Sequence, residues 1–279
     1  MAESEELGIA TGEAQAGGRA VAGASRGPVL GPPLVEYLLR LGDDRLILGH
    51  RLSEWCGHGP ILEEDIALSN MALDLIGQAA SLLRLAGEAE GQGRDEDALA
   101  YWRDGVRFRN ALLMELPKGD FGFTVVRQFL VSAQSVFLWE ALLASTHEGL
   151  AGVAAKAIKE AKYHLRHASE WVVRLGDGTP ESHDRVQRAL DDCWRYTGEL
   201  FAQDEVDAAV AALGITVDMA SIRARWDQVV DDVLQRATLT RPADGPMRHG
   251  GRVGRHTEHL GHLLSVMQSV ARAHPGATW

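Results

Sequence analysis

The feature that most constrains the fold is the spacing of the apolar residues. From Leu34 onward they recur every three or four positions, which is the period of an amphipathic α-helix, and strand-like alternation is missing. Clusters of Gly and Pro at residues 57–60, 117–120 and 176–180 interrupt this pattern. The resulting helical segments are Pro33–Cys56, Leu62–Ala89, Gly122–Thr146, Gly149–Leu175, Pro180–Leu213, Asp218–Ala237 and Arg255–Ala273, with a shorter helical piece at Asp95–Leu116 and a polar loop at Arg241–Gly254.

Segment length then predicts the architecture. The first four long segments are each about twice the ~11–12 residues of an average globular helix. Long amphipathic helices joined by short loops pack as a four-helix bundle, so we predict an all-α fold with additional C-terminal helices. Residues 1–33 are rich in Gly, Ala, Ser and Glu and lack this period, so we predict a disordered or mobile tail before a helical domain at residues 34–279.

Charge and composition exclude several classes of protein. Lys and Arg number 28 against 39 Asp and Glu, a net charge of −11, which argues against binding to nucleic acid or to an anionic membrane surface. No run of about 18 uncharged apolar residues is present, so no membrane span is expected. Two cysteines cannot form a disulfide framework or a four-cysteine zinc site. The first 31 residues do not resemble a secretory signal, and we therefore expect a cytoplasmic protein.

Four-helix bundles can hold a pair of metal ions with one Glu on each of two helices and Glu-x-x-His on each of the other two. We looked for such acids by placing successive residues about 100° apart around each helix axis. In segment 62–89 this places Leu75 at the centre of the buried stripe, Gln78 at its edge and Asp74 on its flank.

Segment 149–175 repeats the same layout. Ala161 lies at the centre of its buried stripe, His164 at the edge and Glu160 on the flank. A metal-binding pair of helices would place a carboxylate at each centre and a histidine at each edge. The two segments therefore have the layout of two Glu-x-x-His motifs. Of the four ligand positions, only the one at His164 still holds a residue that could bind a metal.

The other two bundle helices offer charged residues that do not make a ligand set. On the first, Asp44 lies on the buried stripe and Arg51 at its edge. Because an isolated buried charge is costly, we expect Asp44, Arg51, Arg127 and His164 to find partners among themselves. On the third, Glu140 points about 120° away from the favoured stripe. That stripe is Arg127, Leu130, Gln134, Phe137, Leu138, Ala141 and Ser145. We therefore predict that the positions of a degenerate metal site are Asp44, Asp74, Leu75, Gln78, Arg127, Gln134, Glu160, Ala161 and His164.

Five sequence strings stand out along the chain: LGDD at 41–44, LGHRLSEWCGHGP at 48–60, ALDLIGQA at 72–79, KAIKEAKYHLR at 156–166 and HTEHLG at 256–261. In this order they resemble the PaaC family, the C subunits of multicomponent phenylacetyl-CoA epoxidases. The resemblance runs from about Leu34 to the terminal Trp279 and leaves out the N-terminal tail.

This resemblance implies a ferritin-like fold and a role in aerobic phenylacetate breakdown. It implies a complex with a homologous A subunit that holds a di-iron centre, a small B subunit, a reductase carrying FAD and an iron–sulfur cluster, and an accessory subunit. That complex converts phenylacetyl-CoA into its ring-1,2-epoxide with O2. The C subunit of the family is regarded as a structural, non-catalytic partner of the A subunit, with no cofactor of its own.

Two alternative functions remain open at this stage. The chain could be a di-iron oxygenase in its own right, using Asp44, Asp74, Glu140 and Glu160, if the third helix were rotated by about a third of a turn. It could instead bind a CoA ester, because four basic residues form a strip that could attract phosphates or an acidic partner. A solvated helix face is the simpler interpretation of that strip, which comprises Lys156, Lys159, Lys162 and Arg166.

Overall fold

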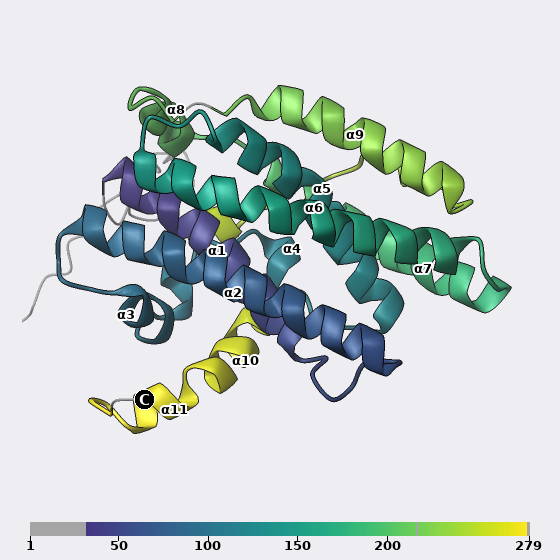
Figure 1. Cartoon of the computed structure of the whole chain (residues 1–279), viewed down its shortest axis with the longest axis horizontal. Coiled ribbons are helices and arrows are strands. Elements are labelled where there is room, and N and C mark those ends of the chain that lie inside the picture. Colours follow the sequence, from purple (N-terminus) through teal and green to yellow (C-terminus); the bar gives the residue numbers. More distant parts are fainter. Residues whose placement is uncertain (1–31, 216, 278–279) are drawn as a thin grey trace, which may run out of the picture.

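The computed structural model describes residues 32–215 and 217–277, and these fold into helices and loops without a β-strand. The four longest core helices are α1 (Pro33–Ser53), α2 (Leu62–Glu90), α5 (Phe121–Leu142) and α6 (Glu148–Gly176). They form one bundle, in which α1 lies along α2, α5 lies along α6, and α2 also contacts α6 (Figure 1). The all-α bundle is thus confirmed, whereas residues 1–31 of the predicted tail lie outside the described part of the chain.

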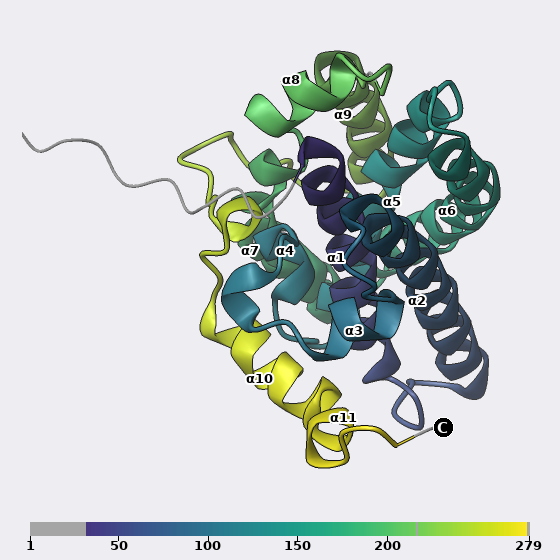
Figure 2. The ribbon, with the colours of Figure 1, turned by 90° about the vertical axis from the view of Figure 1, so that its left-hand side faces the viewer.

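Shorter helices surround this bundle. Helices α7 and α9 pack against α5, α8 packs against α1, and α10 and α11 extend away from the bundle (Figures 1 and 2). The shorter helices are α3 (Glu96–Tyr101), α4 (Leu112–Glu115), α7 (Pro180–Trp194), α8 (Glu205–Ala211), α9 (Met219–Arg236), α10 (Glu258–Met267) and α11 (Ser269–Ala273), with single 3-10 turns η1 (Gly105–Arg107), η2 (Thr197–Leu200) and η3 (Gly251–Val253).

Three predicted segments are broken more often than their apolar pattern indicated. Segment 180–213 divides into α7, η2 and α8, because Asp204 starts a new helix by accepting a hydrogen bond from the backbone N–H of Val206 at 2.9 Å. Segment 95–116 divides because Arg103 and Arg109 turn inward to buried acids of α1. Segment 255–273 divides at Gln268, whose side-chain amide donates to backbone carbonyls of the 95–116 segment.

Helix α5 is buried almost all round. The rest of the bundle covers one side of it, and α7 and α9 cover the other (Figure 2). Trp226 of α9 illustrates this second side, since its indole N–H donates to the carbonyl of Leu130 at 2.9 Å. A helix covered on both sides needs apolar residues all round, which explains why its sequence shows no clear polar face.

Two of the helices are long and apolar enough to cross a membrane, judged by length and composition alone. In α5, 83% of the most apolar window is buried inside the protein, as expected of a core helix. In α2 the corresponding buried share is 44%. The outer face of α2 is therefore unusually apolar for a helix on a protein surface.

Helices α1 and α2 approach each other closely at two glycines of α1. A Cβ atom built on Gly42 would lie 2.9 Å from a methyl carbon of Leu83, and one on Gly49 would lie 2.9 Å from Cγ1 of Ile76. The Gly49 position also faces the backbone carbonyl of Ala72 at 3.2 Å, which cannot move without shifting α2. These two glycines therefore set the distance between the helices, and hence the position of the residues that α2 sends into the bundle.

Replacing Gly49 by Ala should destabilise the protein by about 1 kcal/mol or more, because the added methyl group overpacks the α1–α2 contact. Gly77 of α2 is the matched control, since a Cβ there meets no atom within 4 Å. Gly77→Ala should leave stability unchanged or raise it by up to about 1 kcal/mol. Urea unfolding of both variants checks this, and equal effects at the two positions would contradict it.

Candidate functional site

The predicted site lies where α1, α2, α5 and α6 meet. The space between their side chains is a cavity of about 10 Å3. Leu75 and Gln78 reach it from α2, and Ala161 and His164 reach it from α6. The complete lining is Arg45, Leu48, Leu75, Gln78, Gln128, Val131, Ser132, Ser135, Trp139, Ala161 and His164.

The repeated layout of α2 and α6 produces a crosswise pair of hydrogen bonds. The side-chain amide of Gln78 donates to Oε2 of Glu160 at 2.8 Å, and Nε2 of His164 lies 3.0 Å from Oδ2 of Asp74. Each edge residue thus bonds the flank acid of the other helix. Both acids are held at the rim by these bonds instead of pointing into the bundle.

Arg45 and Leu48 reach the heart of the bundle from α1, and the sequence pattern had not singled out Arg45. Its side chain is 2% exposed, and its Nη1 donates to Oγ of Ser135 at 2.9 Å. Its guanidinium carbon also lies 5.1 Å from the centre of the Trp139 ring. Burial lowers the pKa of Arg45 to about 10, so the group is still a cation at neutral pH.

A sequence signal for Arg45 was available. Leu41, Arg45, Leu48 and Leu52 follow the spacing i, i+4, i+7 and i+11 of one helix face. Asp44 fits almost as well, at three residues after Leu41 and four before Leu48. Periodicity alone therefore did not decide between the two neighbours.

The predicted orientation of α5 was wrong by one residue, a rotation of about 100°. Gln128, Ser132 and Ser135 face the cavity, together with Val131 and Trp139. The predicted stripe faces the outer helices instead: Gln134 donates to the carbonyl of Leu200 at 3.5 Å. The physical reason is that other helices pack against both sides of α5. The helix therefore has no polar face from which its rotation about its own axis could be predicted.

The expected pairing among Asp44, Arg51, Arg127 and His164 was also wrong. Arg127 donates to the carbonyls of Leu116 and Pro117, at 2.5 and 3.2 Å. Arg51 pairs with Glu54 at 2.6 Å and donates to the carbonyl of Glu115 at 2.9 Å. The backbone carbonyls that these two guanidinium groups bind could not be identified from sequence.

Asp44 lies on the face of α1 away from the cavity and anchors two distant segments. Its carboxylate accepts from the backbone N–H of Ala111 at 2.7 Å and from both terminal nitrogens of Arg252, at 3.0 and 2.8 Å. Burial alone would lower the pKa of Arg252, but the charge and the hydrogen bonds of Asp44, together with the charges of Glu199 and Asp207, outweigh burial and raise that pKa above its ordinary value. Asp43 similarly binds Arg103 and the backbone N–H of Arg109.

These residues do not fit a pair of iron ions. Such a site uses carboxylates and histidines, whereas Leu75, Ala161 and a buried guanidinium stand at this centre. Glu140, a further acid of the alternative di-iron hypothesis, lies half-exposed and pairs with Arg225 at 2.7 Å. Across residues 32–215 and 217–277, no three His, Cys, Asp or Glu side chains are grouped closely enough to hold a metal ion.

The basic strip lies on the exposed side of α6. The Nζ of Lys156 is 3.6 Å from Glu160, and Arg166 stacks over the ring of Tyr163. Lys159 and Lys162 are exposed. Lys156 also borders a groove of about 290 Å3 between α2 and α6, lined mostly by small residues.

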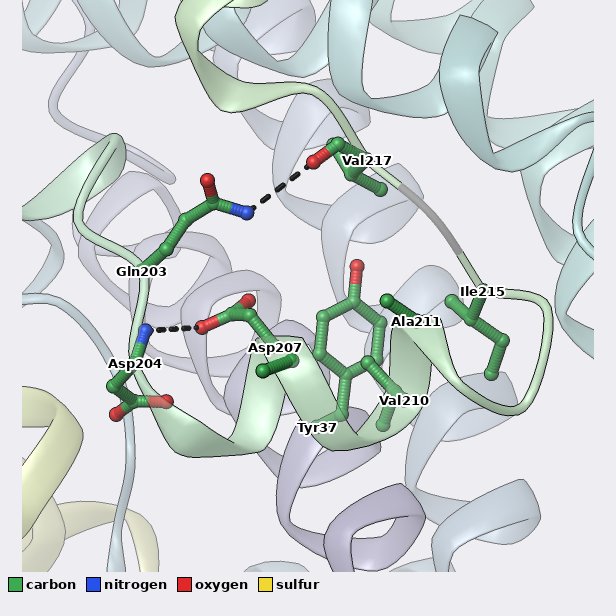
Figure 3. Close-up of a pocket in the computed structure, with 9 residues that line it drawn as sticks. Tyr37, Gln203, Asp204, Asp207, Val210, Ala211, Ile215 and Val217 are labelled. Carbon is green, nitrogen blue, oxygen red and sulfur yellow. Dashed lines mark hydrogen bonds between the residues drawn. The ribbon is translucent and has the colours of Figure 1, made fainter.

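A separate pocket, of about 250 Å3, lies between α1 and α8 (Figure 3). The hydroxyl of Tyr37 points into it, and burial raises the pKa of this phenol above its ordinary value. Asp207 borders the pocket, and Arg40 pairs with it at 3.5 Å and with Asp204 at 2.7 Å. The pocket thus offers a neutral O–H donor and a partly neutralised acid, away from the bundle heart.

Comparison with known proteins identifies relatives of the chain. The sequence model of the PaaA and PaaC proteins, described as phenylacetic acid catabolic protein, matches residues 26–279. The C subunit of the 1,2-phenylacetyl-CoA epoxidase of Escherichia coli (strain K12) is 48% identical over 246 residues, which cover 88% of this chain and 99% of that protein. The resemblance found in the sequence is therefore confirmed.

Replacing Arg252 by Met should destabilise the protein by about 3–5 kcal/mol, because Asp44 would be left buried without its charged partner. Arg225→Met is the matched control, since Arg225 forms an exposed pair with Glu140, and it should cost less than about 1 kcal/mol. Chemical unfolding measures both.

A second change tests the cause of that loss. Adding Asp44→Asn to Arg252→Met should recover part of the lost stability, because the unpaired charge is removed. A double variant that is no more stable than Arg252→Met alone would show that the pairing of Asp44 is not what Arg252 contributes.

Proposed function

Because the chain belongs to the family of phenylacetic acid catabolic proteins, we propose that it is the non-catalytic, structural subunit of a 1,2-phenylacetyl-CoA epoxidase. In this role it pairs with a homologous subunit that carries the di-iron centre and keeps that subunit's helices in place. The chain has no cofactor of its own. The complex is cytoplasmic and works in aerobic phenylacetate degradation.

The observation that carries this proposal is the composition of the bundle heart. Two iron ions need several negatively charged oxygen ligands, and the centre of this bundle presents Leu75, Ala161 and the cation of Arg45. The two nearest acids, Asp74 and Glu160, are engaged at the rim by His164 and Gln78. We interpret Asp74, Leu75, Gln78, Glu160, Ala161 and His164 as the positions of a degenerate metal site.

The surface of α2 supports the pairing. Leu62, Ile66 and Leu73 are 71%, 52% and 67% exposed, and their spacing places them on one face of the helix. Exposed apolar stripes of this kind are typical of protein interfaces. A partner with the same bundle fold can lay a helix along this stripe, and we propose that the homologous di-iron subunit does so.

The rest of the complex follows from the family resemblance. A small B subunit, a reductase with FAD and an iron–sulfur cluster, and an accessory subunit are proposed as the remaining partners. Neither nucleic acid nor a membrane is a proposed partner.

The first alternative is that this chain is itself the di-iron oxygenase. It requires Asp44, Asp74, Glu140 and Glu160 to converge, but Asp44 binds Arg252 on the far face of α1 and Glu140 pairs with Arg225 at the surface. The actual rotation of α5 brings serines and a glutamine to the cavity in place of acids. The observations therefore favour the structural subunit.

The second alternative, a module that binds the CoA ester, depends on the basic strip of α6. Lys156, Lys159, Lys162 and Arg166 could contact either CoA phosphates or an acidic partner surface. Such a contact stays a prediction. Replacing the three lysines by Gln in the assembled complex tests it, and an unchanged affinity for the CoA ester would exclude it.

Glu160→Gln should leave turnover of the assembled complex within about two-fold of wild type, because the contacts of this acid are a hydrogen bond to Gln78 and an ion pair with Lys156. A catalytic carboxylate would instead lose about 100-fold or more. The positive control replaces a Glu of the Glu-x-x-His motif in the di-iron subunit by Ala, which should abolish turnover. Loss of activity in a fully assembled Glu160→Gln complex would contradict the proposal.

Leu73→Glu should weaken association with the di-iron subunit by about ten-fold or more, because a charge would be buried at the proposed interface. Leu213→Glu is the matched control: Leu213 is 55% exposed but follows α8, which lies apart from the outer face of α2 (Figures 1 and 2). Co-expression and size-exclusion chromatography measure both. Equal retention of the partner by both variants would place the interface elsewhere.

A further inference from the structure

A buried phenol of α1 has no hydrogen-bond partner within residues 32–215 and 217–277. Tyr37 is 4% exposed, and its hydroxyl bonds no other described group. The hydroxyl points into the pocket of about 250 Å3 between α1 and α8 (Figure 3). Buried hydroxyl groups are nearly always hydrogen-bonded, so one that is aimed into a pocket without a protein partner indicates a ligand that enters the pocket.

The charge of this pocket is negative. Its described lining includes Asp204 and Asp207 but no Lys, Arg or His. One cation, Arg40, serves both acids: its guanidinium lies 2.7 Å from Asp204 and 3.5 Å from Asp207. A single guanidinium cannot neutralise two carboxylates, so negative charge remains on the side of Asp207.

The pKa shifts agree with this unequal division of Arg40. Burial opposes ionisation of Asp204, but the hydrogen bond and charge of Arg40 outweigh burial and lower the pKa of Asp204. The same cation does not outweigh burial at Asp207, whose pKa is raised and whose side chain is 14% exposed. Burial, and then the charge of Asp207, raise the pKa of Tyr37, which places this carboxylate near the phenol.

The remaining wall of the pocket is largely apolar and small. Val210 and Ile215 are 1% and 2% exposed, and Val217 and two alanines of α8 complete this wall. The volume lies below the ~300–1,000 Å3 of sites that take drug-sized ligands. A fitting ligand is therefore a small molecule with one polar end and a short apolar body.

From these observations we propose that the pocket binds a small primary alkylammonium ion. The ammonium group lies against the carboxylate of Asp207 and donates to the hydroxyl oxygen of Tyr37, which can accept as well as donate. The alkyl chain packs on Val210, Ile215 and Val217. Two acids in the lining disfavour an anion, and a neutral alcohol of the same shape leaves the charge of Asp207 uncompensated. The proposal concerns this chain alone and does not rest on the proposed function.

Nuclear magnetic resonance of the full chain, with 13C-labelled tyrosine rings, tests the proposal. The sequence has four tyrosines, and the Tyr37 signal is assigned by elimination from the variants Tyr101→Phe, Tyr163→Phe and Tyr196→Phe. Three probes of one shape are titrated at pH 7, where the amine is charged: butylammonium, 1-butanol and butyrate.

The expected result is a saturable shift of the Tyr37 signal with butylammonium. Binding of 1-butanol should be weaker by about ten-fold or more, and butyrate should not bind, because charge decides the affinity. Absence of a saturable Tyr37 shift with butylammonium would overturn the proposal. Equal affinities for butylammonium and 1-butanol would also overturn it, and this comparison needs no pocket variant to fold.

A matched pair of variants tests the part played by Asp207. Asp207→Asn removes the charge but keeps an oxygen for the backbone N–H of Asp204, and it should weaken butylammonium binding by about ten-fold or more. Asp232→Asn is the control, because Asp232 is 66% exposed on α9, and it should leave the affinity unchanged. An unchanged affinity in a folded Asp207→Asn protein would overturn the assignment of Asp207 as the partner of the cation.

Discussion

The fold depends on how the charges buried along α1 are neutralised. A charge taken out of water must find an opposite charge or several hydrogen bonds, and α1 carries Asp43, Asp44 and Arg45 in succession at the middle of the protein. The two acids draw in Arg103 and Arg252, which bring the 95–116 segment and the loop before α10 onto one face of the helix. Arg45 lies about 100° further round the helix from Asp44 and enters the bundle heart.

This arrangement separates the residues that hold distant segments together from the positions that we propose to be a degenerate metal site. Asp44, an acid that could have served a metal, is used to hold distant segments together. In its place the bundle receives a guanidinium group, with Leu75 and Ala161 opposite. A bundle of this composition keeps the helical framework of its family while its centre disfavours dications, and this combination supports our proposal of a structural subunit.

Much of this organisation was predictable from the sequence. The long helices followed from the helical period and the Gly and Pro breakers. The period of about 100° per residue also placed Leu75 and Ala161 toward the bundle centre, where both line the cavity. The orientation of α5 did not follow, because α7 and α9 cover its second side and leave no polar face to read. Arg45 was missed because it and Asp44 fit the same stripe, and only the positions of Arg252 and Ala111, distant in sequence, decide between them.

The central claim is that the heart of this bundle does not hold iron. It is tested most directly by anomalous diffraction, recorded on both sides of the iron absorption edge, from crystals of the co-purified complex. The account predicts anomalous peaks inside the partner's bundle and none between Arg45, Gln78 and His164 of this chain. A pair of peaks at that position in this chain would contradict it.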